Sequence, residues 1–219
     1  MVAGVAGRHL AFSVADGVRA DAWFDRTTGS LMLAGRPLLP RSALPLLGDH
    51  NVANALAAAL ALHAVGVDHL SLAEGLASFR ALTHRMEPVR EVHGVLWIND
   101  SKATNVASTL VAVQAMTRPF VLMLGGRHKG EPYTALRAPL QAHGVAVIAY
   151  GEAGDLVEAD LGDAIRVVRG GTFEDCMTKA AALVPKKGAV LLSPACSSYD
   201  MFDNYEQRGA TFRRLVEAM

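Results

Sequence analysis

Several features are scarce in this sequence of 219 residues, and each scarcity excludes a class of protein. Acidic and basic residues number 21 each, so no strong positive charge is available to hold nucleic acid or an anionic membrane, and we expect neither as a partner. The apolar run from Val52 to Leu62 is broken by Asn54 and is too short to span a bilayer. Hydrophobic residues make up 51% of the chain, which excludes disorder and suffices for a buried core.

Cysteine is also rare, and the histidines are dispersed. Cys176 and Cys196 stand in a sequence without a secretory leader, which predicts reduced thiols in a cytoplasmic protein. None of the 8 histidines has the spacing typical of metal ligands, so we expect no transition-metal site built by this chain alone. Glu87, Asp100 and Asp200 could bind Mg²⁺ together with a nucleotide, although isolated carboxylates are more often solvated or paired with arginine.

A further absence concerns nucleotide binding. The sequence contains no Gly-x-x-x-x-Gly-Lys-Ser/Thr motif, so it has no P-loop to cradle a triphosphate. The start at Met1–Gly4 resembles neither a targeting peptide nor the beginning of a domain. We therefore expect that further chain belongs upstream.

The first part of the chain is predicted to contain hairpins and two helices. Short apolar segments at Leu10–Val14, Val18–Phe24 and Leu31–Leu33 are separated by Gly, Pro and Asp, a pattern typical of β-hairpins. Val52 to Leu60 then show a helical apolar face, and Ser71 is predicted to cap a second helix that ends near Phe79. The polar segment before Pro88 predicts a domain boundary, which divides the chain into residues 1–82 and 83–219.

From Val89 onward the pattern alternates between strand and helix. Continuous apolar strands linked by helical crossovers predict an α/β domain with a mostly parallel, doubly wound sheet. Expected strands are 94–99, 120–124, 146–150, 164–168 and 189–192, and expected helices are 105–116, 132–143, 152–160, 172–184 and one from Glu206.

Three strand ends of this domain carry polar loops: Asn99–Asn105, Gly125–Gly130 and Ser193–Asp200. The carboxyl ends of parallel strands share one edge of a sheet, so we expect these loops to lie together at a ligand site. Lysine is rare in the chain, yet Lys102 and Lys129 stand in two of these loops, where an ammonium group suits capture of a carboxylate or phosphate. A solvated loop lysine is the competing interpretation for each.

The third loop also contains three nucleophilic groups, Cys196, Ser197 and Ser198. No Gly-x-Ser-x-Gly elbow surrounds them, and the sequence assigns them no activating histidine and acid. Hydroxyl groups that bind a ligand or cap the turn are the favoured interpretation.

Taken together, these motifs resemble the Mur ligases over nearly the whole chain. The motifs are Gly48–Asn54, His84–Glu87, Asn99–Asn105, Gly125-Gly126 with Lys129, and Ser193–Cys196 followed by Glu206–Gly209. The third and fifth motifs are most similar to those of the family member that adds D-glutamate. The resemblance implies that residues 83–219 form a Rossmann-like C-terminal domain binding D-glutamate. It implies that residues 1–82 are the closing part of a P-loop ATPase-type central domain.

The resemblance also implies roles for individual residues. Contacts to ATP are implied for Asn51 and Asn54 at the adenine, Arg85 at the phosphates and Asp100 at the ribose, and Lys102 would assist binding of phosphate or acyl phosphate. The implied D-glutamate residues are Thr104, Lys129, Ser198, Tyr199 and Tyr205. The family's carbamylated lysine and most of its Mg²⁺ ligands would belong to the absent part. The loop Arg127-His128-Lys129 and the aromatic Tyr199 and Tyr205 depart from the usual pattern of the family, in residues that would shape the pocket.

The implied activity is ATP-dependent, ADP-forming addition of D-glutamate to UDP-N-acetylmuramoyl-L-alanine in peptidoglycan synthesis, through an acyl phosphate. A chain without the UDP-binding domain and the P-loop is expected to be inactive alone. Two alternatives stay open: a non-catalytic module that binds an acidic amino acid or nucleotide, and a fragment of a folylpolyglutamate-synthase-like ligase.

Overall fold

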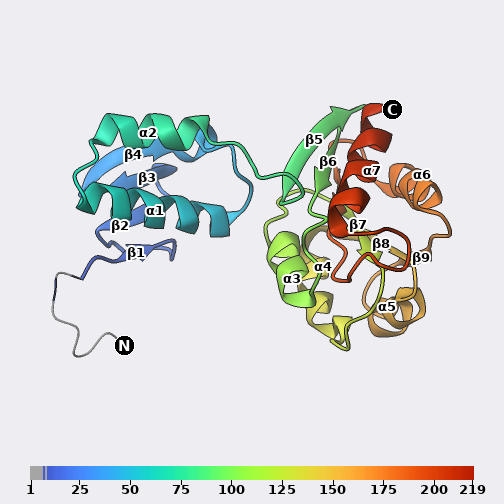
Figure 1. The fold of residues 1–219 in the computed structure, drawn as a ribbon. Helices are drawn as coiled ribbons and strands as arrows, with labels where there is room; N and C mark the ends of the chain where they lie inside the picture. Colours follow the sequence, from blue (N-terminus) through green and yellow to red (C-terminus); the bar gives the residue numbers. More distant parts are fainter. Residues whose placement is uncertain (1–6, 8) are drawn as a thin grey trace. The chain divides into compact units, whose positions relative to one another are not determined.

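A small sheet and two helices form the first part of the chain in the computed structural model, which describes residue 7 and residues 9–219 (Figure 1). The start at Met1–Gly4 lies outside the described residues. The sheet has the order β1-β2-β3-β4, with the strands β1 (Phe12–Ser13), β2 (Ala22–Asp25), β3 (Ser30–Leu33) and β4 (Arg36–Pro40). The pair β2–β3 is a hairpin as expected, and β3–β4 is a further hairpin. The pair β1–β2 is parallel and therefore is not a hairpin.

A short 3₁₀ turn (Arg41–Ala43) leads to the helices α1 (Asp49–Ala64) and α2 (His69–Ser78), which pack on this sheet. Val52, Leu56 and Leu60 of α1 are buried, which confirms the predicted apolar face. The predicted cap of α2 is wrong, because Asp68 is the N-cap and accepts hydrogen bonds from the backbone N–H and the hydroxyl of Ser71. A carboxylate three residues earlier in the chain thus takes the role assigned to Ser71.

The second part is the α/β domain that the alternating pattern predicts. Its six-stranded sheet has the order β5-β6-β10-β7-β8-β9. The strands are β5 (Glu87–Val92), β6 (Val95–Asn99), β7 (Phe120–Gly125), β8 (Gly144–Tyr150), β9 (Val167–Arg169) and β10 (Ala189–Leu192). All of them run parallel except β5, which pairs antiparallel with β6.

Helices cover both faces of this sheet, as a doubly wound fold requires. On one face lie α3 (Val106–Gln114), the 3₁₀ turn η2 (Tyr133–Leu136), α4 (Arg137–His143) and α5 (Gly154–Leu161), and on the other lie α6 (Phe173–Leu183) and α7 (Tyr205–Glu217) (Figure 1). The core under α6 and α7 includes Trp97, whose ring centroid lies 6.0 Å from that of the buried Phe212. This aromatic contact joins α7 to β6.

The helix starts in this domain follow from their capping side chains. Asn105 caps α3 by accepting from the N–H of Ser108, and Thr172 caps α6 by accepting from the N–H of Asp175, and each stands at the first position of a predicted helix. Two strands that the sequence pattern does not predict, β4 and β5, are edge strands that contain proline (Pro37 and Pro40 in β4, Pro88 in β5). Proline is tolerated at a sheet edge, where its missing N–H costs no ladder hydrogen bond.

Contacts within the chain cluster into two units, residues 1–80 and 81–219. The predicted boundary between residues 82 and 83 lies two residues from this division. The assignment of the first unit to a central ATP-binding domain stays a prediction. No helix among the described residues is long and apolar enough to cross a membrane.

The contact between Trp97 and Phe212 supplies a test of the core. Replacement of the fully buried Phe212 by alanine is expected to lower the free energy of unfolding by about 3–5 kcal/mol, because it removes a large side chain and leaves a cavity. Urea unfolding followed by the fluorescence of Trp97, in a Trp23→Phe background, measures this change.

Arg214→Ala, at an exposed position of the same helix, is the control and is expected to stay within about 0.5 kcal/mol of the parent. Equal unfolding midpoints for the two variants would contradict the placement of α7 on the core.

Candidate functional site

The predicted site residues of the second unit come from loops at the carboxyl edge of its sheet. Strand β10 lies between β6 and β7, so the loops that follow these three strands are neighbours. The N–H of Asp100 donates to Leu192 O at 2.8 Å, and the N–H of Gly125 donates to Pro194 O at 3.1 Å. The N–H of Ala195 donates to Ala103 O at 3.0 Å. Backbone hydrogen bonds therefore join the last loop to both of the others.

The Gly125–Gly130 loop runs antiparallel to part of the Ser193–Asp200 loop. Arg127 N–H donates to Ser197 O at 2.9 Å, and Ser197 N–H donates to Arg127 O at 3.2 Å. Gly126 has φ 126°, and a Cβ at this position would lie 2.2 Å from Ser197 O. Only glycine allows this approach of the two loops.

Asp100 is a buried carboxylate that joins segments distant in the sequence. Its Oδ1 accepts from the N–H of Met86 at 3.1 Å, and its Oδ2 accepts from Ser193 Oγ at 2.8 Å. Burial raises the pKa of Asp100 from 3.8 to about 6, and the two hydrogen bonds and the charge of Arg85 oppose this rise. Both carboxylate oxygens are thus already bonded within the protein.

The segment His84–Met86 has an unusual backbone that presents Arg85. His84 and Met86 have φ 64° and 44°, in the left-handed region that is rare for residues other than glycine. The His84 N–H donates to Glu87 Oε2 at 3.0 Å, and Asp100 holds the Met86 N–H. The side chain of Arg85 between them is exposed. Buried carboxylates therefore stabilise the turn that carries this cation.

The imidazole of His84 lies behind this turn, in a buried polar cluster. Asn99 Nδ2 lies 3.0 Å from His84 Nδ1 and also donates to Glu87 Oε2 at 3.1 Å and to Gly209 O at 3.2 Å. Burial lowers the pKa of His84, and the charge of Arg213 lowers it further. The cluster connects the turn to β6 and α7.

The structure brings two of the predicted D-glutamate residues into direct contact. Lys129 Nζ donates to Thr104 Oγ1 at 3.4 Å, which links the first two loops through their side chains. Ser198 is buried in the third loop, whereas Tyr199 beside it is 62% exposed.

Lys102 and Tyr205 form a second contact at this edge. The ammonium of Lys102 lies 5.6 Å from the centroid of the Tyr205 ring, within the range of a cation–π interaction. Tyr205 begins α7, and its hydroxyl is hydrogen-bonded to Glu206, which raises the pKa of that hydroxyl. Lys102 thus approaches the start of α7, whereas Lys129 approaches Thr104.

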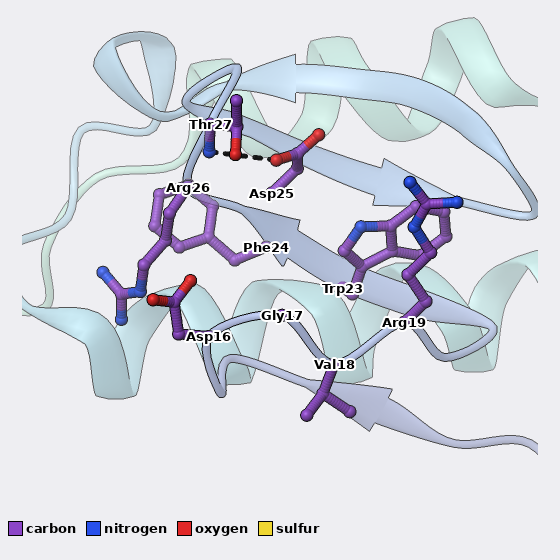
Figure 2. Close-up of a pocket in the computed structure, with 9 residues that line it drawn as sticks. All are labelled: Asp16, Gly17, Val18, Arg19, Trp23, Phe24, Asp25, Arg26 and Thr27. Atoms are coloured by element: carbon purple, nitrogen blue, oxygen red, sulfur yellow. Dashed lines mark hydrogen bonds between the residues drawn. The ribbon is translucent and has the colours of Figure 1, made fainter.

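Asn51 and Asn54 belong to the first unit, in the first two turns of α1. Asn51 Nδ2 donates to Leu47 O at 2.7 Å, and Asn54 Nδ2 lies 3.5 Å from Asn51 Oδ1. A pocket of about 210 Å³ in the same unit is lined by the β1–β2 connection, by β2 and by the turn after β2, with Arg19, Trp23 and Arg26 among the lining residues (Figure 2). None of the predicted site residues lines that pocket.

The described residues contain no group of three or more His, Cys, Asp and Glu side chains that could hold a metal ion.

The structure adds two polar groups to this edge, Tyr133 and Arg208, to which the sequence analysis assigned no role. Tyr133 Oη lies 2.9 Å from both His128 Nδ1 and Cys196 Sγ, so a buried tyrosine connects the second and third loops. Arg208 is fully buried beneath the first and third loops. The motif Glu206–Gly209 marks Arg208 in the sequence, whereas no sequence signal singles out Tyr133.

Comparison with known families agrees with this geometry. Residues 84–196 match the family described as Mur ligase, glutamate ligase domain. A curated relative, UDP-N-acetylmuramoylalanine--D-glutamate ligase of Salinibacter ruber, is 45% identical over 183 residues. The match covers 83% of this chain and 40% of the relative, so the chain spans about two fifths of that protein's length.

Solved structures show the same fold at lower sequence identity. MurF from Acinetobacter baumannii superposes with a TM-score of 0.67 at 17% identity, over 95% of this chain and 46% of that one. Folylpolyglutamate synthase from Mycobacterium tuberculosis, solved with ADP, gives a TM-score of 0.56 at 19% identity, over 78% of this chain and 41% of that one. These likenesses support the α/β fold and do not distinguish the substrates.

The buried Asp100 predicts a pH dependence of stability. Its pKa is about 6 in the folded chain, against an ordinary value of 3.8, so the folded state binds the proton more tightly. Because of this difference, raising the pH from about 4 to about 6 is expected to remove roughly 1–3 kcal/mol of stability.

Urea unfolding of the wild type and of Asp100→Asn across this pH range measures the contribution of Asp100. The stability of the wild type relative to the variant is expected to fall as the pH rises. A difference that stays constant or grows with pH would contradict the shifted pKa.

Proposed function

Because this chain belongs to the Mur ligase family through its glutamate ligase domain, we propose that it supplies the D-glutamate site and part of the ATP site of an ADP-forming amide ligase. The ligase would act in peptidoglycan synthesis in the cytoplasm, with UDP-N-acetylmuramoyl-L-alanine as the acceptor. The observation that carries the proposal is the junction of three polar loops at one sheet edge, with Lys129 bonded to Thr104. The curated D-glutamate ligase at 45% identity supports the choice of substrate.

In the proposed reaction the acceptor carboxylate attacks the γ-phosphorus of ATP, which forms an acyl phosphate and releases ADP. The amine of D-glutamate then attacks the acyl carbon, and the tetrahedral intermediate collapses to the amide and inorganic phosphate, while the amine loses its proton. Such chemistry depends on alignment and on neutralising negative charge, and it needs no protein nucleophile. The proposal is therefore consistent with a site of lysines, arginine and hydroxyls.

The residues near the phosphates would be Arg85 and Lys102. Arg85 is exposed on a turn whose backbone is held by buried carboxylates, and a guanidinium can bind two phosphate oxygens at once. Lys102 would neutralise the phosphate or acyl phosphate from the neighbouring loop. Asp100 would bind the ribose by accepting a hydrogen bond from one of its hydroxyl groups. Each oxygen of Asp100 already accepts one hydrogen bond within the protein, and a carboxylate oxygen has lone pairs for a second. Asn51 and Asn54 would contact the adenine.

The D-glutamate residues would surround the amino-acid carboxylates. Lys129 and Thr104 supply an ammonium group and a hydroxyl that already contact each other. Ser198 would donate its hydroxyl, and the backbone of Tyr199 and the ring of Tyr205 would complete the pocket. The Mg²⁺ that accompanies ATP would be held mainly by groups outside this chain.

Two alternatives make different predictions. A dedicated sensor of an acidic amino acid or a nucleotide would bind one ligand tightly without turnover, whereas a part of a ligase should bind D-glutamate and ATP weakly by itself. A folylpolyglutamate-type ligase would accept L-glutamate in place of D-glutamate. Its structural likeness here rests on 19% identity, whereas the D-glutamate ligase of Salinibacter ruber shares 45%, so the D-glutamate reaction is favoured.

ADP release with ATP, D-glutamate and UDP-N-acetylmuramoyl-L-alanine tests the proposed function. The chain alone is expected to show no turnover. Addition of the N-terminal part of the Salinibacter ruber relative, which this chain does not cover, is expected to restore activity with D-glutamate and not with L-glutamate. Turnover by the chain alone would refute its inactivity, and preference for L-glutamate would refute the assigned substrate.

Lys129→Ala is expected to raise the KM for D-glutamate by about tenfold or more in the restored enzyme, because one charge-assisted hydrogen bond to a carboxylate is lost. The KM for ATP should stay unchanged. Lys186→Ala, in an exposed turn before β10, is the matched control for loss of an ammonium group. An unchanged KM for D-glutamate in the Lys129 variant would show that this lysine does not bind the substrate.

A further inference from the structure

Arg208 on α7 is the largest charged side chain buried in the second unit, with 0% of its surface exposed. Its Nε donates to Ser101 Oγ at 2.9 Å, and its Nη2 donates to Ser101 O at 2.9 Å. Nη1 and Nη2 each lie 3.3 Å from Cys196 O. A single guanidinium group therefore binds the first and third loops of the site at the same time.

The second loop lies against the same group. A Cβ at Gly126 would be 3.3 Å from Arg208 Nη1 and 3.1 Å from the Cβ of Cys196. Ser101 in turn donates from its hydroxyl to Tyr205 O at 2.8 Å, at the start of α7. Arg208 thus lies where the three loops and the first turn of α7 meet.

The charge of Arg208 is not neutralised by an ion pair. All of its hydrogen-bond acceptors in the described structure are carbonyl or hydroxyl oxygens, and no carboxylate forms a salt bridge with it. Burial of an unpaired cation is costly, and an apolar side chain of similar size would avoid that cost. A positive charge beneath the loops, with no carboxylate in salt-bridge contact, does, however, favour binding of an anion at their surface.

We propose that Arg208 is a positioning residue for a dicarboxylate amino acid, which fixes the first and third loops and adds positive potential beneath them. The proposal rests on the proposed function, because it takes D-glutamate as the ligand of this edge. Arg208 would not touch the ligand itself. It would act through Ser101, next to Lys102, and through Cys196, two residues before Ser198.

NMR titration of the chain with D-glutamate tests the proposal, since backbone amide shifts report weak binding and local structure together. Arg208→Met is expected to raise the Kd for D-glutamate by about tenfold, through loss of a charge and of its hydrogen bonds. Arg208→Lys keeps the charge without the planar fork, so its Kd is expected to lie between those of the wild type and Arg208→Met. Ser101→Ala keeps Arg208 and removes the hydrogen bond from its Nε to Ser101 Oγ. This variant is expected to raise the Kd for D-glutamate by about threefold.

Arg214→Met, at an exposed position of the same helix, is the matched control and should bind like the wild type. Amide shifts of the remote strands β8 and β9 verify that each variant is folded, and if Arg208→Met does not fold, Arg208→Lys and Ser101→Ala decide the question. Wild-type affinity in folded Arg208→Met, or in both of the milder variants, would overturn the proposal. Equal affinity of folded Arg208→Lys and Arg208→Met would overturn the role of charge. Absence of D-glutamate binding by the wild type would instead count against the proposed function.

Discussion

The position of β10 between β6 and β7 is the constraint on which the site depends. The strands β6, β7 and β10 are the first, second and last parallel strands along the chain, yet they are neighbours in the sheet. The loops that follow them therefore meet at one edge. Ligands bind at such edges of open α/β sheets because backbone N–H groups and helix starts converge there. Here backbone hydrogen bonds from Asp100, Gly125 and Ala195 fix the loops to one another. The three loops of the candidate site are therefore held in place by the fold itself.

Much of this fold could be predicted from apolar periodicity and capping residues. The central strands are continuous apolar runs, and Asn105 and Thr172 cap the helices that the sequence assigns to them. The edge strands β4 and β5 were not predicted because proline and polar residues interrupt their apolar pattern, and a sheet tolerates such residues at its edge. The cap of α2 was misassigned because Asp68 and Ser71 are both good capping residues, and only the backbone geometry distinguishes them.

The sequence predicted that the three polar loops share one sheet edge, but it did not predict the contacts within and beneath them. Polar loops at strand ends suggest where a ligand binds, but sequence spacing does not reveal that Asp100 is buried with both oxygens bonded. It also does not reveal that Arg208 lies beneath the first loop, because its contacts with Ser101 join residues 107 positions apart. Buried polar groups depend on tertiary partners, which local patterns do not specify.

The central claim is that the three loops form one binding site for a dicarboxylate. A crystal structure of this chain soaked with D-glutamate tests it most directly. The account predicts density for the ligand at the carboxyl edge of the second sheet, with its carboxylates within hydrogen-bond distance of Lys129, Thr104 and Ser198. Density for D-glutamate at any other place on the chain, with these three side chains free of ligand, would contradict it.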